Sequence, residues 1–187
     1  AQRHGVDYEE AFALVAKMTT IRTVIGRNIQ GVAPPSNGRQ ERPQNAFLQG
    51  ELDEEVYMVQ PPGFKSCTHP QAVCQLRKPL YGLKQASRAW HSRITQYLHQ
   101  IGFNMSKSDN SLLIRSDSRG LVFIIIYVDD LVIGGEHLAD ISHIKKLLSG
   151  RFEMKDMKEL HYFLGIEVIR ALDGIMLSQR HYILNLL

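Results

Sequence analysis

Apolar residues recur along this chain with two different periods. Between residues 86 and 102, large apolar side chains return every three or four positions, which predicts an amphipathic helix ended by Gly102. A similar spacing over residues 138–148 predicts a second helix. Two further helices are expected to begin near Ile21 and near Arg180.

Short apolar segments of alternating or continuous character lie between these helices and predict strands. Because strand pairs alternate with helices, we predict an α+β fold, an antiparallel sheet with helices on one face. Residues 26–44 follow neither period and are rich in Gly, Pro and Asn, so we expect them to be the least regular internal segment. The predicted strands are 55–60, 73–77, 111–114, 121–128, 131–133, 161–169 and 175–177.

Composition narrows the class of protein. The chain has 187 residues, with 22 Lys and Arg against 19 Asp and Glu, a surplus of +3 that suits a phosphate-bearing partner without requiring one. Its longest apolar run, residues 121–128, is too short to cross a bilayer, and no signal peptide opens the sequence. Cys67 and Cys74 have no metal-site spacing, which predicts unpaired thiols. Both ends look cut, so we expect a fragment.

The stretch IIIYVDDLVIGG at 124–135 places Asp129 and Asp130 between two apolar segments. Asp is a common turn residue, and a plain β-turn is the simplest interpretation. The flanking strands, however, look buried on both faces, and a carboxylate pair there is costly unless cations neutralise it. Paired Asp with a third carboxylate on a neighbouring strand is the ligand set for two Mg²⁺ ions in phosphoryl transfer.

The YVDD motif at 127–130 resembles the catalytic box of reverse transcriptases. Its surroundings narrow the resemblance to the Copia-type retrotransposon Pol polyprotein, and it covers nearly the whole chain except residues 26–44. The resemblance implies a polymerase palm with partial fingers and the start of the connection toward the thumb, as one reverse-transcriptase fragment over residues 1–187, truncated at both ends. The other matching motifs are NAFLQGELDEEVYMVQPPGF at 45–64, LYGLKQASRAW at 80–90, MKDMKELHYFLGIEV at 154–168 and GIMLSQRHYILNLL at 174–187.

Matching motif positions carry the family's roles. Asp129 and Asp130 would be catalytic and hold metal, while Tyr127 and Val128 shape the turn beneath the primer end. Leu164 and Gly165 resemble the segment that positions the primer strand. Gln85 resembles the residue that lines the template and nucleotide groove. Phe47 matches the family's sugar-selecting aromatic residue, although it could equally be an ordinary core residue. Lys84 and Arg88 could contact phosphates, although exposed cations are usually only solvated.

The resemblance also implies cofactors and partners. Two Mg²⁺ ions, an RNA template, a DNA primer and deoxynucleoside triphosphates would bind, and no membrane is involved. Integrase and RNase H domains would belong to the full-length polyprotein. The expected location is cytoplasmic, in a virus-like particle, and not secreted.

One expected carboxylate is missing. The family's motif Asp-Val-Lys-Asn-Ala-Phe-Leu places its first catalytic Asp at position 42, where this chain has Arg42. Glu41 is one residue away and would point to the opposite face of a strand. Codons for residues 37–42, read one nucleotide later, can encode Met-Asp-Val-Lys-Asn-Ala. We therefore interpret residues 26–44 as translated out of frame, through compensating indels in a decayed element or a gene-model error.

Three functional hypotheses follow. The first is a reverse-transcriptase-family domain, catalytically impaired as written because Arg42 replaces an Asp. The second is a palm-fold remnant that binds nucleic acid without turnover, with a salt-dependent affinity. The third is another metal-dependent phosphoryl-transfer enzyme using Asp129 and Asp130, which no other motif supports.

Overall fold

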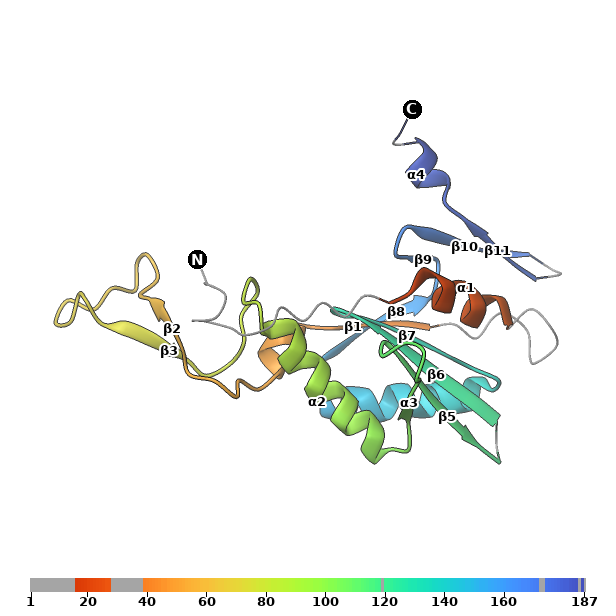
Figure 1. The fold of residues 1–187 in the computed structure, drawn as a ribbon, viewed down its shortest axis with the longest axis horizontal. Helices are drawn as coiled ribbons and strands as arrows, with labels where there is room; N and C mark the ends of the chain where they lie inside the picture. Colours follow the sequence, from red (N-terminus) through yellow and green to blue (C-terminus); the bar gives the residue numbers. More distant parts are fainter. Residues whose placement is uncertain (1–15, 28–38, 119, 172–173, 185, 187) are drawn as a thin grey trace. The chain divides into compact units, whose positions relative to one another are not determined.

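The computed structural model describes most of the chain, and its internal contacts divide the chain into two compact units. Of the described residues, 45–97 form the first unit, whereas 16–27, 39–44 and those from 98 onward form the second. Among the described residues, no helix has both the length and the apolar character to cross a bilayer. The single-domain expectation stays a prediction. The described residues are 16–27, 39–118, 120–171, 174–184 and 186 (Figure 1).

The first unit contains a short 3-10 helix, a two-stranded ribbon and most of a long helix, whose last residues belong to the second unit. The 3-10 helix η2 (Ala46–Gln49) buries Ala46 and Phe47. Strands β2 (Val56–Val59) and β3 (Val73–Leu76) pair antiparallel. Helix α2 (Ala86–Gln100) buries the side chains predicted from its period, including Trp90 and Ile94. Both predicted strands and the predicted helix are therefore confirmed within one or two residues. Cys67 and Cys74 are free thiols, as predicted.

The second unit is built on a six-stranded antiparallel sheet of order β4-β5-β6-β7-β1-β8 (Figure 1). The apolar runs that predicted strands form its centre, where consecutive residues such as Ile124, Ile125 and Ile126 are all buried. Burial on both faces explains why these strands do not alternate with polar residues. The strands are β1 (Arg39–Pro43), β4 (Asn104–Met105), β5 (Leu112–Asp117), β6 (Gly120–Tyr127), β7 (Asp130–Gly135) and β8 (Met154–Glu159).

Different elements cover the two faces of this sheet. On one face, Ile125 and Val132 join a hydrophobic cluster with Ile21 of helix α1 (Met18–Arg27). On the other face, helix α3 (Leu138–Arg151) reaches Glu41 through Lys145. The expectation of helices on one face is therefore wrong. The sheet interior is apolar on both sides, and each side needs a cover.

A three-stranded sheet of order β11-β10-β9 completes the second unit. Strand β10 (Ile166–Ala171) pairs with β11 (Gly174–Ser178) and with β9 (Tyr162–Phe163). We predicted one strand over residues 161–169, but Leu164 and Gly165 have φ of 51° and 80° and turn the chain between β9 and β10. The short helix α4 (Arg180–Leu184) begins where the sequence predicted.

Part of the segment 26–44, residues 39–43, is more regular than we expected. Residues 28–38 lie outside the described part of the chain. Arg39–Pro43, however, form β1, an interior strand between β7 and β8, so the expectation of irregularity is wrong there. Strand pairing uses main-chain hydrogen bonds, which a polar sequence supplies as well as an apolar one. Whether this segment is out of frame stays a prediction.

Candidate active site at the acidic hairpin

Asp129 and Asp130 lie at the turn of the β6–β7 hairpin, as the sequence predicted. Tyr127 is paired with Asp130, so Val128 and Asp129 form a two-residue connection. Val128 has a φ of 51°, a left-handed conformation that a β-branched side chain rarely adopts. Such strain persists where the surrounding structure imposes it, and it is common at functional sites. The two long, buried strands on either side supply that constraint.

Arg42, at the position where the sequence led us to expect a carboxylate, forms an ion pair with Asp130. Its Nε donates a hydrogen bond of 2.8 Å to Asp130 Oδ1, and its Nη2 donates one of 3.3 Å to Oδ2. The Nε2 of Gln40 lies 3.4 Å from the same Oδ1. A two-pronged guanidinium contact of this kind is the strong form of an ion pair. The Asp130 side chain is 18% exposed, so its negative charge is largely compensated from β1.

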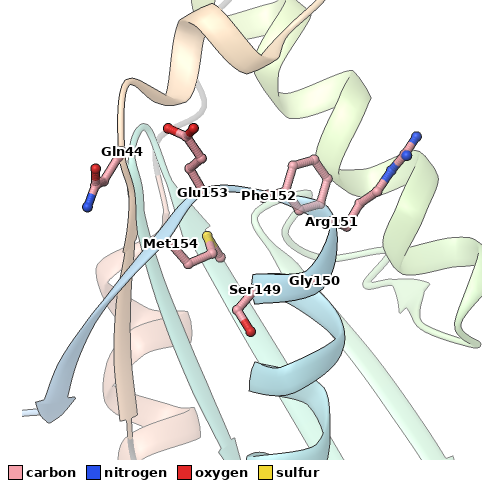
Figure 2. A pocket seen from close by; sticks show the side chains of 7 residues that line it. All are labelled: Gln44, Ser149, Gly150, Arg151, Phe152, Glu153 and Met154. Atoms are coloured by element: carbon pink, nitrogen blue, oxygen red, sulfur yellow. The ribbon is translucent and has the colours of Figure 1, made fainter.

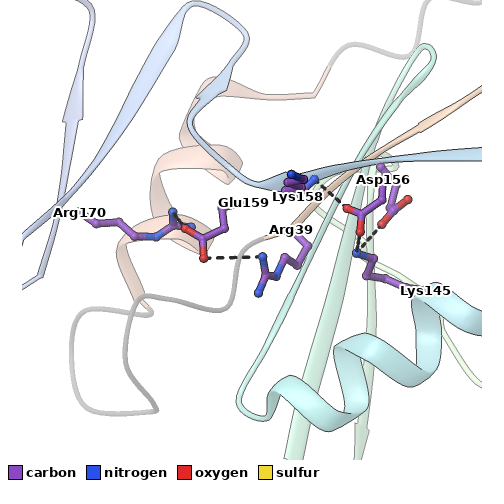
Figure 3. A network of polar contacts seen from close by, with 7 residues as sticks. Arg39, Lys145, Asp156, Lys158, Glu159 and Arg170 are labelled. Carbon is purple, nitrogen blue, oxygen red and sulfur yellow. Dashed lines mark hydrogen bonds and ion pairs between the residues drawn. The ribbon is translucent and has the colours of Figure 1, made fainter.

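Glu41 does not replace the missing acid, because it points to the other face of the sheet, as predicted. It is paired with Leu131 and with Asp156, and its Oε1 lies 2.9 Å from Nζ of Lys145 on α3. Figure 3 shows Lys145 reaching Asp156 as well, at 2.7 Å. Burial raises the pKa of Glu41 despite the lowering effect of Lys145. This carboxyl is therefore paired with Lys145, which it shares with Asp156.

The predicted primer-positioning residues belong to the same unit. The Tyr127 ring meets the edge of the Phe163 ring, with centroids 6.3 Å apart. Phe163 ends β9, and Leu164 and Gly165 follow it directly in the turn to β10. Tyr127 and Leu164 both pack against the hydrophobic cluster of the second unit. The structure thus brings the β9–β10 turn to the face of the sheet that carries Asp130 and Arg42.

The other predicted site residues belong to the first unit. Phe47 is 5% exposed, and the ring of Tyr81 lies against it with centroids 4.3 Å apart. Gln85 is half-buried just before α2, while Lys84 and Arg88 are exposed. Sequence reasoning missed Tyr81, although it stands in the same LYGLKQ motif as Gln85. The motif indicated that this segment is important, but it did not indicate which of its residues contacts Phe47.

The residues at the hairpin do not fit two divalent ions. Among the described residues, no group of three or more His, Cys, Asp and Glu side chains is placed to hold a metal ion. Arg42, at the position where we expected the third carboxylate, carries a guanidinium, which keeps its charge at any physiological pH and repels a divalent cation. Asp130, one of the two remaining candidates, already compensates that guanidinium. The side chains around the turn therefore include one carboxylate fewer than two metal ions need, and they include the additional cation Arg42.

A shallow cavity of about 470 Å³ opens where β1 and β8 meet the end of α3 (Figure 2). Pro43 is paired with Met154, and Gln44 donates its main-chain N–H to Glu153 at 2.8 Å. The cavity therefore lies at the end of the sheet that carries the acidic turn. Glu153 is the one carboxylate among its lining residues, so it offers no catalytic cluster. The lining residues are Gln44, Ser149, Gly150, Arg151, Phe152, Glu153 and Met154.

Comparison with known proteins gives consistent matches. The family described as Reverse transcriptase (RNA-dependent DNA polymerase) matches residues 1–187. Two Arabidopsis thaliana proteins, the Retrovirus-related Pol polyproteins from transposons RE2 and RE1, are 47% and 49% identical to the chain over 186 residues, which is 100% of it. The corresponding protein from transposon TNT 1-94 of Nicotiana tabacum is 35% identical over 97% of the chain. The chain spans 12–14% of the length of these relatives.

Proposed function

Because the chain belongs to the Reverse transcriptase (RNA-dependent DNA polymerase) family, in its Copia-type retrotransposon branch, we propose that it is a polymerase palm with impaired turnover. The reaction for which such a hairpin is suited is template-directed DNA synthesis. In that reaction a primer 3′-hydroxyl attacks a deoxynucleoside triphosphate and pyrophosphate leaves. Asp129 and Asp130 would hold the metal ions that this transfer needs.

One observation carries the proposed impairment, namely the ion pair between Arg42 and Asp130 at 2.8 Å. Metal-dependent phosphoryl transfer needs a surplus of negative charge at the metal ligands. Arg42 both removes one ligand and neutralises another. Loss of one preorganised electrostatic group in an active site costs on the order of 10²–10³-fold in rate, and reversal of its charge should cost more.

The remaining partners follow from the family and are part of the proposal. An RNA template and a DNA primer would lie along the face of the sheet that carries Asp130 and the β9–β10 turn. Magnesium would be the divalent ion of an intact site. Leu164 and Gly165 would steady the primer strand, and Phe47 with Gln85, Lys84 and Arg88 would line the nucleotide groove. Integrase and RNase H domains would accompany this domain in a polyprotein, within a cytoplasmic particle.

Primer extension on an RNA template tests the proposal. The chain as written should not extend a primer with Mg²⁺ or Mn²⁺. The triple variant R42D/P43V/Q44K, which rebuilds the family motif, should gain extension, if necessary with the family's upstream fingers segment added. Arg39→Asp is the charge-matched control, because it makes the same change on the same strand and leaves the Asp130 pair in place.

Extension by the unaltered chain that Asp129→Asn abolishes would refute the proposed impairment. Failure of the rebuilt, extended variant would show that Arg42 is not the cause. A folded chain that binds template and primer without extending them favours the second hypothesis, a nucleic-acid-binding remnant. The compensated charge at Asp130 supports that hypothesis, since it removes the need for metal ions at the hairpin.

A further inference from the structure

Lys155 on β8 lies directly opposite Arg42 on β1. The two residues are paired in the antiparallel register, and directly opposite side chains project from the same face of a sheet, about 4.5–5.5 Å apart at Cβ. Arg42 contacts Asp130, so this is the face of the acidic turn. The neighbouring pair, Glu41 and Asp156, projects to the opposite face, where Lys145 contacts both. The two neighbouring pairs therefore project from opposite faces of the sheet, as the alternation of side chains along a strand requires.

Two like charges directly opposite each other destabilise a sheet unless an anion lies between them. Asp130 compensates Arg42, whose side chain is still 47% exposed. Lys155 is exposed, and no described residue forms a salt bridge or side-chain hydrogen bond with it. Two cations thus lie directly opposite each other, beside the turn that carries the carboxylates Asp129 and Asp130.

The opposite face of the same two strands carries a different arrangement of charges. There, one cation, Lys145, lies between two carboxylates, Glu41 and Asp156. That cluster has no cationic surplus, and Glu41 within it is buried. The two faces of the β1–β8 pair therefore differ, with two opposed cations on one face and a single cation between two carboxylates on the other.

We propose that Arg42 and Lys155 form a phosphate-binding pair that takes one backbone phosphate of a nucleic-acid strand without a divalent ion. The choice of a nucleic-acid strand rests on the proposed function, while the anion site itself rests on the charges. A guanidinium fork and an ammonium group are the two side chains that proteins use most for phosphate. A nucleoside triphosphate offers the same chemistry, so the test must separate the two sources.

Equilibrium binding of a fluorescent RNA–DNA primer–template to the full chain tests this pair. Affinity is measured by anisotropy across a series of salt concentrations, in EDTA and in Mg²⁺. The expected result is equal binding with and without metal. Lys155→Gln should weaken binding several-fold at low salt and reduce the slope of log K against log salt by about 1. Lys155→Arg should retain both the affinity and the slope.

Lys146→Gln is the matched control, since Lys146 is an exposed lysine on α3, which covers the opposite face. Three outcomes would each overturn the proposed phosphate-binding pair. They are equal effects of Lys155→Gln and Lys146→Gln, binding that requires Mg²⁺, and an absence of binding in EDTA at low salt. Displacement of the primer–template by deoxynucleoside triphosphate at equal phosphate concentration would also overturn it, by identifying a nucleotide site. None of these readouts needs turnover, so they are independent of the primer-extension result. Circular dichroism of each variant confirms that it is folded.

Discussion

Lys145 of α3 and Glu41 of β1 form an ion pair across the α3 face of the sheet, with 2.9 Å between Nζ and Oε1. Hydrogen bonds to Asp156 and Glu41 raise the pKa of Lys145, against the lowering effect of burial. The hydrogen bond from Lys145 in turn lowers the pKa of Asp156. The ammonium group is thus what allows a carboxylate to lie within a buried interior strand.

Removal of that ammonium group should destabilise the second unit. Lys145→Met leaves Glu41 nearly buried beside Asp156 without a cation, which should lower the free energy of unfolding by about 3 kcal/mol. The double variant K145M/E41M should recover most of the loss, because apolar side chains of similar size can replace a buried ion pair. Urea denaturation measures all three chains. A double variant as unstable as Lys145→Met would show that the pair is not the source of the effect.

The same strands show how far the sequence could predict this site. The β6–β7 hairpin was predictable because two apolar runs flank Asp129 and Asp130. A continuous apolar run is itself the sequence pattern of a strand that is buried on both faces. Strand β8 was not, since MKDMKE has no apolar period, and its side chains are placed by pairing with β1. The pairing of Arg42 with Asp130 depends on which strands are neighbours, information that a linear pattern does not contain. Motif comparison identified the position of Arg42 but not its partner.

Phe47 illustrates a motif whose role the sequence left open between sugar selection and the core. Its ring is 5% exposed beneath Tyr81, so substitution should be costly. Phe47→Ala should lower stability by about 3–4 kcal/mol, as for other buried aromatic residues. Tyr81→Ala should cost less, about 1 kcal/mol, because Tyr81 is 67% exposed and its truncation uncovers little buried apolar area. Equal losses in thermal unfolding for the two variants would contradict this order.

Asp109 should give the fold a stability that is lost in acid. Burial opposes its ionisation, but hydrogen bonds from Ser111, Thr20 and the Lys17 main chain hold its pKa below the ordinary 3.8. A lowered pKa means that the unfolded chain binds the proton more tightly. The stabilisation is therefore complete above about pH 3.8 and is lost as the pH falls through the lower, folded-state pKa.

Asp109→Asn should cost about 1–3 kcal/mol near neutral pH, because one main-chain or hydroxyl donor loses its acceptor. It should also flatten the dependence of stability on pH in the acid range. Denaturation curves at a series of pH values measure both effects. Asp53→Asn, at an exposed position, is the control and should leave the pH dependence unchanged. An acid dependence that survives Asp109→Asn in full would rule out this carboxyl as its source.

Divalent ions should not stabilise the chain as written, since Arg42 compensates Asp130. Arg42→Asp adds a third carboxylate, whose repulsion should lower stability in EDTA and whose metal affinity should restore it. Metal at ten times its dissociation constant adds about 1.4 kcal/mol, which corresponds to roughly 3–5 °C in a protein of this size. Thermal unfolding with and without Mg²⁺ measures the shift. An Mg²⁺-dependent rise in the unaltered chain, reversed by Asp129→Asn, would contradict the prediction.

Val128 should store strain that a smaller residue releases. Its φ of 51° at the first position of a two-residue hairpin turn favours glycine, which has no Cβ to clash. Val128→Gly should therefore raise the free energy of unfolding by about 1 kcal/mol. In an ordinary strand position, by contrast, a glycine lowers the free energy of unfolding by a similar amount. Val122→Gly, within β6, is the matched control and should be strongly destabilising, since Val122 is 2% exposed. Urea denaturation compares the two variants, and a loss of stability in Val128→Gly would mean that the turn holds no strain.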